Sequence, residues 1–286
     1  MTGETSPLAR PDFPILKADF TEDRAVRVVP VDASVESVRA PLRDQLASFG
    51  FVVASFPPGT KPEAAIGALA RNLGLGELYV PVLYRFPEAK GFGGTLSNIE
   101  HDDAADHPGF ATRSGQPWHV DGTLESIGAI RTSVLYCVRA AVSGGCTHLF
   151  NAVAAFRELQ RSDPEAAQVL LDPFVLRRIS TILSQAEWTD GPAFAECSDG
   201  SCVNRFSEGD TVRWSAPEGK EEELERALTF LRARAESGRY RVSVRLEAGQ
   251  CLIFRNDQIS HSREEYVDNP EVPRKLIRAL FEQAPE

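Results

Sequence analysis

Several features that define common protein classes are missing from this sequence of 286 residues. No apolar run approaches the ~20 residues of a membrane-spanning helix, and the start, MTGETSPLARPDFP, lacks the basic and apolar stretches of a signal peptide. Basic residues are outnumbered, since 31 Lys and Arg against 41 Asp and Glu give a formal net charge of −10. This balance disfavours nucleic acid or an anionic membrane as partner. We expect a soluble, cytoplasmic protein with a small-molecule partner; a homo-oligomer is left open.

Cysteine and histidine are both scarce, with five of each. An odd number of scattered cysteines without a signal peptide predicts reduced thiols rather than a disulfide framework. Cys197 and Cys202 form a CxxxxC pair, but no second pair accompanies it, which disfavours a zinc site. Five histidines are also fewer than a metal enzyme of the cupin type normally uses.

Apolar periodicity and turn residues predict many short strands and a few helices. The expected helices span residues 38–49, ending at Gly50, and residues 61–74, 152–160 and 221–237. The expected strands span residues 51–56, 118–121, 132–138, 147–150, 174–182, 210–214, 240–246, 251–254, 258–261 and 275–282. This pattern indicates a mainly β fold with flanking helices, a sandwich or jelly roll. No linker divides the chain, so we expect one domain over residues 1–286.

Three segments lack such periodicity. Residues 1–32 are polar and predict an extended lead-in. Residues 93–117 are rich in Gly, Asp and Pro and predict a long loop. Residues 183–209 are rich in Gly, Ser and Asp; they suit either a lid over an active-site mouth or a plain surface excursion.

A His-x-Asp motif follows Trp118 where strand character begins. In a strand, His119 and Asp121 point to the same face and present an imidazole beside a carboxylate. These are two ligands of the 2-His-1-carboxylate triad that holds non-haem Fe(II). A second copy, at His101 and Asp103, lies in a polar segment without strand pattern, so we expect both residues, and His107, in a solvated loop.

A third ligand must come from a distant strand, and His261 is the candidate. A lone histidine could equally be a hydrogen-bonded residue at a strand end. Downstream, Arg274, Leu276 and Arg278 share one face of the last predicted strand. Buried arginines need partners, so two on one face indicate a pocket for carboxylates, which guanidinium binds bidentately.

Together these motifs resemble the taurine dioxygenase (TauD/TfdA) family of Fe(II)- and 2-oxoglutarate-dependent oxygenases. The resemblance runs from about residue 110 to the C-terminus and includes a GG-x-T strand that leads into a helix, GGCTHLFNAVAAF. The four-part motif is far more specific than its pieces. Its residues, in the order and spacing of the family, are His119, Asp121, Thr147 after Gly144 and Gly145, His261 and Arg274.

The resemblance implies a double-stranded β-helix (jelly roll, cupin-like) with iron at one open end. His119, Asp121 and His261 would bind the metal. Arg274, helped by Thr147, would bind the distal carboxylate of 2-oxoglutarate. Arg278 matches a position that touches an acidic substrate group in some members, although spacing does not separate its role from that of Arg274. His148 would point to the face opposite Thr147 and be structural.

The implied activity uses O2 to hydroxylate an unactivated C–H bond of a small polar metabolite, releasing succinate and CO2. Desaturation, cyclisation and C–C or C–N cleavage remain alternatives. Halogenation is not expected, because Asp121 fills the place that halogenating relatives leave for chloride. A non-catalytic jelly-roll binding protein is the alternative of another class. The substrate-binding candidates, which suggest a carboxylate-bearing or amino-acid-derived substrate, are Arg278, Arg213, Arg205 and Trp118.

Overall fold

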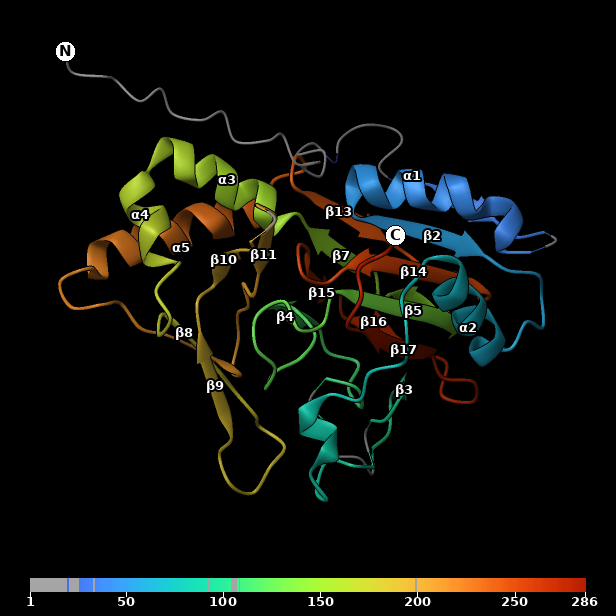
Figure 1. Ribbon diagram of the computed structural model, residues 1–286. Helices are drawn as coiled ribbons and strands as arrows, with labels where there is room; N and C mark the ends of the chain where they lie inside the picture. The colour runs from blue at the N-terminus through green and yellow to red at the C-terminus, as the bar shows by residue number, and fades with distance from the viewer. Residues whose placement is uncertain are drawn as a thin grey trace, which may run out of the picture.

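The computed structural model describes residues 20, 26–32, 34–91, 93–103, 107, 109–198 and 200–286 (Figure 1). Its helices are α1 (Arg39–Phe49), α2 (Pro62–Asn72), α3 (Ala152–Ser162), α4 (Pro164–Val169) and α5 (Glu221–Ala235), with 3-10 helices η1 (Glu36–Val38) and η2 (Val82–Arg85). Its strands are β1 (Val28–Pro30), β2 (Phe51–Ser55), β3 (Leu96–Glu100), β4 (Gln116–His119), β5 (Thr132–Arg139), β6 (Ser143–Gly144), β7 (Thr147–Phe150), β8 (Leu176–Ile179), β9 (Trp188–Gly191), β10 (Phe194–Glu196), β11 (Cys202–Asn204), β12 (Val212–Trp214), β13 (Arg241–Val244), β14 (Gln250–Arg255), β15 (Ser260–Arg263), β16 (Tyr266–Val267) and β17 (Lys275–Phe281).

Two sheets form a jelly-roll core, as the strand pattern predicts. One has six strands in the order β1-β2-β14-β5-β17-β3, and the other has four in the order β13-β7-β15-β4. Leu252 and Phe254 of β14 pack in one buried cluster with Leu135 of β5 and with Leu149 of β7 on the four-stranded sheet. The residues between them on β14 point the opposite way. This alternation lets one strand serve two cores.

The other face of the six-stranded sheet is covered by α1 and α2 (Figure 1). Val52 and Ile253 pack there against Leu42 and Leu46 of α1. Gly50 ends α1 with a φ of 75°, and its N–H donates to the carbonyl of Leu46, which confirms the C-cap expected from the sequence.

The remaining helices, α3, α4 and α5, gather at the other side of the molecule (Figure 1). They share a buried cluster with the small sheets β12-β8-β9 and β10-β11. Phe156 of α3 stacks on Phe194 of β10 with ring centroids 4.2 Å apart. This second hydrophobic cluster packs against Trp118 of β4, the strand that leads into the His-x-Asp motif.

In each of the three segments that lack periodicity, the structure contains strands that the sequence did not predict. Residues 183–209 are not one loop, because they contain β9, β10 and β11. The segment 93–117 contains β3, which pairs with β17 at the sheet edge, and the start of β4. Within residues 1–32, β1 pairs with β2 in parallel, while residues 1–19 and 21–25 lie outside the described part. Short strands of this kind carry too few residues for their alternation to be read.

Two expectations about the whole chain can be compared with the described residues. All five cysteines are free thiols, as predicted. Among the residues that the structure describes, no helix is long and apolar enough to cross a membrane.

Candidate active site

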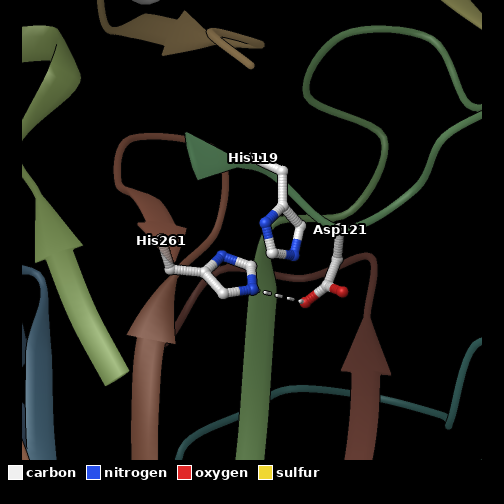
Figure 2. Close-up of side chains that lie close together, drawn as sticks. All are labelled: His119, Asp121 and His261. Atoms are coloured by element: carbon white, nitrogen blue, oxygen red, sulfur yellow. Dashed lines mark ion pairs between the residues drawn. The ribbon is translucent and has the colours of Figure 1, made fainter. Parts of the chain in front are cut away.

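Three potential metal ligands meet at one end of the four-stranded sheet. β4 and β15 are antiparallel neighbours, and their register places His261 opposite His119. Asp121 follows β4 two residues later. One nitrogen of each imidazole and one oxygen of the carboxylate all lie within 4.8 Å of one another, and Figure 2 shows the three side chains converging. In the described ranges this is the only group of three or more His, Cys, Asp or Glu side chains close enough to hold an ion.

The local electrostatics leave all three groups ready to bind a cation. Burial and the neighbouring His261 lower the pKa of His119 to about 3, and burial also lowers the pKa of His261. Burial raises the pKa of Asp121, but Arg278 and the two imidazoles outweigh it and hold this pKa well below its usual range. At neutral pH the site therefore presents two neutral imidazoles and a carboxylate, the protonation states that metal binding requires.

Surrounding residues fix the orientation of the ligands. His119 Nδ1 lies 2.9 Å from the carbonyl oxygen of Pro117, which directs Nε2 toward the other ligands. Asp121 accepts a hydrogen bond of 2.6 Å from the Ser133 hydroxyl and contacts Arg278 through its other oxygen. The backbone N–H of Asp121 donates to Asn256 Oδ1 at 2.8 Å. Asp121 is thus held at both carboxylate oxygens and at its backbone N–H.

A small inner pocket continues from the triad between the two sheets. Arg274 and Thr147 both lie there, almost fully buried. The Arg274 guanidinium sits 4.9 Å from the centre of the Tyr266 ring, its Nη1 has no hydrogen-bond partner, and no described carboxylate pairs with it. The inner pocket is lined by Ile99, Phe110, Gln116, His119, Asp121, Leu135, Thr147, His261, Ser262, Arg263, Arg274, Leu276 and Arg278.

The Gly-Gly pair before Thr147 has a steric reason. Gly144 and Gly145 adopt φ values of 69° and 72°, in the left-handed region that favours glycine. A Cβ on Gly144 would overlap the carbonyl oxygen of Glu265, because β6 approaches β16 closely there. The turn delivers the chain into β7, whose first residue is Thr147.

An outer cavity of about 440 Å³ opens on the other side of the triad. This volume falls within the roughly 300–1,000 Å³ of small-molecule sites. The outer cavity is lined by Pro81, Leu83, Tyr84, His107, Gly109, Phe110, Gly115, Gln116, Pro117, His119, Val120, Asp121, Gly122, Thr123, Arg178, Ile179, Ser180, Thr181, Ile182, Glu208, Asp210, Thr211 and Arg278.

Comparison with known proteins decides the family. Residues 16–280 match the model of the taurine catabolism dioxygenase TauD, TfdA family. The chain belongs to the TauD/TfdA family. It is therefore an enzyme, a 2-oxoglutarate-dependent iron dioxygenase that acts on a small molecule, and not a binding protein without activity.

Two relatives of this TauD-family chain are named uridine-5'-phosphate dioxygenase. One, from Amycolatopsis sp., is 43% identical over 270 residues, which cover 94% of this chain and 98% of the relative. The other, from Streptomyces sp., is 43% identical over 248 residues, 85% of this chain and 89% of the relative. Among solved structures, an asparagine oxygenase matches with a TM-score of 0.66 and 19% identity, covering 86% of this chain and 78% of that one. At this identity the structural match supports the jelly-roll fold alone.

Three of the predicted substrate contacts of this TauD-family enzyme lie away from the outer cavity. Arg213 is exposed and donates to the carbonyls of Asp210 and Val212 at its own strand. Trp118 packs toward the helical side, with its ring 5.7 Å from that of Phe150. Arg205 is 1% exposed and donates to two backbone carbonyls behind the cavity wall. Only Arg278, of the four predicted residues, lines the cavity.

Two histidines differ from the expectation of a solvated loop. His101 is half-buried, with Nδ1 2.6 Å from the carbonyl of Ala111. His107 is buried, and its ring stacks on Phe110 at 4.0 Å in the wall of the outer cavity. His148 is half-buried and bonds Ser243 Oγ, in keeping with its predicted structural role on the face opposite Thr147.

Sequence reasoning missed two residues that the structure places at the site. Arg178 of β8 is 2% exposed and lines the outer cavity. Its signal was present, because adjacent arginines in a strand must face opposite ways and Arg177 is the exposed one. Asn256 sits in a turn-like segment, and nothing in the sequence indicates that its side chain reaches Asp121.

Proposed function

We propose that His119, Asp121 and His261 hold Fe(II), and that Arg274 and Thr147 bind the distal carboxylate of 2-oxoglutarate. The gathered ligand atoms support the first assignment. The buried guanidinium that lines the inner pocket, with no hydrogen-bond partner at Nη1, supports the second. Once bound, iron and 2-oxoglutarate supply the activation of O2, coupled to conversion of the co-substrate into succinate and CO2.

The substrate that we propose is uridine 5'-phosphate, in place of an amino acid derivative. The observation that carries this proposal is the 43% identity over 94% of the chain to a protein named for that substrate. The outer cavity supports it, because a small-molecule space with buried cationic side chains in its wall suits a nucleotide. Hydroxylation of one substrate C–H bond is the reaction outcome that we propose.

The residues of the chain would have distinct tasks in this reaction. Ser133, Asn256 and Arg278 position the Asp121 carboxylate, so its geometry is set before substrate arrives. Arg278 also lines both the inner pocket and the outer cavity, so its side chain would lie next to both the co-substrate and the substrate. The stacked rings of His107 and Phe110 form part of the cavity wall.

Four further expectations belong to this proposal. The segment 183–209 would act as a lid, because residues just before it and Glu208 within it border the outer cavity. A cytoplasmic location and a homo-oligomeric state remain predictions. A single domain over residues 1–286 is proposed on the same footing.

The decisive experiment is 2-oxoglutarate turnover by the Fe(II)-loaded enzyme in air, with and without nucleotides. We expect uridine 5'-phosphate to stimulate succinate formation strongly, and mass spectrometry to detect an oxidised uridine product. Uridine, cytidine 5'-phosphate and asparagine serve as comparison substrates. Stimulation by an amino acid and not by the nucleotide would contradict the proposed substrate.

A further inference from the structure

The wall of the outer cavity contains an arginine whose charge nothing in the described chain neutralises. Arg178 is 2% exposed, and no described carboxylate lies within ion-pair distance of it. Its Nε has no hydrogen-bond partner. A buried cation without a counter-charge is costly, so such a group normally has a ligand.

The guanidinium of Arg178 is held in place by a neighbour. Ser207 donates its hydroxyl proton to the carbonyl of Arg205 at 3.1 Å, which turns a lone pair toward Arg178. Arg178 Nη1 donates to that oxygen at 2.8 Å. The Nη1 end of the Arg178 guanidinium is thereby fixed. Its other N–H groups remain available to a ligand in the cavity.

The acidic residues nearby do not take that place. Asp121 and Glu125 attract Arg178 only from beyond ion-pair distance, and Asp121 is already in contact with Arg278. Glu208, on the cavity wall, pairs with Arg232 at 3.0 Å. Asp210 lies at the exposed margin of the cavity. The balance of charge deep in the cavity is therefore positive.

Other buried arginines of the region have clear partners, which sets Arg178 apart. Arg278 contacts Asp121, and Arg263 donates to the carbonyls of Gly109, Thr112 and Ser114. Arg205 also lacks an ion pair with a described carboxylate, but it donates to two backbone carbonyls and does not line the outer cavity. Arg274 is a closer parallel, since it too has no such ion pair and lines the inner pocket. One such arginine stands in the inner pocket and the other in the outer cavity.

We propose that Arg178 is the anion subsite of the outer cavity and binds the phosphate of the nucleotide substrate. This proposal rests on the proposed function and names the residue that selects a phosphorylated over an unphosphorylated nucleoside. Guanidinium suits the task, because its planar fork matches two oxygens of a phosphomonoester. Ser180 and Thr181, which also line the cavity, stand two and three residues along the chain.

The test compares uridine 5'-phosphate with uridine on the wild-type enzyme, on Arg178→Gln and on Arg177→Gln. Arg177 is the matched control, since it lies on the exposed face of the same strand and pairs with Asp190. We expect Arg178→Gln to reduce kcat/KM for uridine 5'-phosphate by at least ~30-fold, the low end for a broken buried charge pair, and to reduce the preference over uridine by the same factor. Arg177→Gln should keep the wild-type preference. An unchanged preference in Arg178→Gln overturns the proposal.

A binding measurement separates this proposal from the proposed reaction. The enzyme is kept under nitrogen with Fe(II) and saturating 2-oxoglutarate. Uridine 5'-phosphate or inorganic phosphate is added, each in a separate sample, and Tm is recorded. Both should raise Tm in the wild type and in Arg177→Gln, because a ligand stabilises the form that binds it. In Arg178→Gln and Arg178→Met, inorganic phosphate should no longer raise Tm, and uridine 5'-phosphate should raise it less than in the wild type. Equal shifts in all variants, or no shift in the wild type, overturn the subsite. Binding without turnover would instead keep the subsite and reject the proposed reaction.

Discussion

The inner pocket and the outer cavity share His119, Asp121 and Arg278, yet their walls are built differently. The inner pocket lies between paired strands, where β7, β15 and β17 supply Thr147, His261 and Leu276. The outer cavity is walled mainly by connections, such as residues 109–115, 180–182 and 208–211. Strand pairing fixes register, so the inner pocket has a rigid wall, whereas the connections around the outer cavity are less constrained. Arg178, on β8, is the strand residue that we propose for substrate binding in that cavity.

The largest predicted effect tests the shared metal site. Replacing Asp121 or His261 with Ala should lower turnover by at least ~10³-fold, because losing a ligand costs more than the roughly 10- to 100-fold of an outer partner. Anaerobic Fe(II) titration and succinate assays measure both losses. His101→Ala, which alters the other His-x-Asp motif, should retain near-normal turnover. A fully active His261→Ala enzyme would refute the triad.

The next prediction concerns the strand-built inner pocket alone. Arg274→Ala should raise KM for 2-oxoglutarate by about 30- to 4,000-fold, since breaking a desolvated Arg–carboxylate pair costs roughly 2–5 kcal/mol. Lys275→Ala is the control, because Lys275 pairs with Glu100 at 3.0 Å on the other strand face. Steady-state kinetics with varied 2-oxoglutarate decide it. Equal effects of the two substitutions would remove the distinction between the two faces.

The wall of the outer cavity predicts a pH effect on stability. Burial and the charge of Arg278 lower the pKa of His107 from 6.5 to about 4. As the pH falls below 6.5, His107 is protonated in the unfolded chain but stays neutral in the folded chain. The free energy of unfolding therefore decreases between pH 6.5 and about 4. The loss should reach about 3 kcal/mol. Urea unfolding across this range should show a steeper loss for the wild type than for His107→Gln; parallel curves would contradict it.

The smallest predicted effect concerns Asn256, which holds the backbone of the metal ligand Asp121 in place. Asn256→Ala removes the acceptor for the Asp121 N–H and the donor to the carbonyl of Ile130. Iron affinity should fall about 10- to 100-fold while the fold persists. Asn72→Ala, in α2, is the matched control, because its side chain bonds only within its helix at 2.9 Å. Identical iron affinities in the two variants would remove Asn256 from the site.

What the sequence predicts follows the same division between the two walls. Alternation along β17 places Leu276 and Arg278 on the inner face, as expected. His119 and His261 were expected in strands over residues 118–121 and 258–261, and they lie on the paired strands β4 and β15. Arg213, a predicted substrate contact, lies outside the outer cavity, because its short strand β12 pairs with β8 and presents it to solvent. His107 is buried through long-range contacts such as that with Tyr84, which leave no local pattern in the sequence.

The sharpest test of the proposed reaction is substrate-dependent oxygen transfer. The Fe(II)-loaded enzyme is incubated with 2-oxoglutarate and uridine 5'-phosphate under ¹⁸O2, and labelled succinate is measured against nucleotide consumed. One ¹⁸O atom is expected in each succinate, and succinate should form in proportion to the uridine 5'-phosphate consumed. Succinate formation that is no faster with the nucleotide than without it would contradict the proposed reaction.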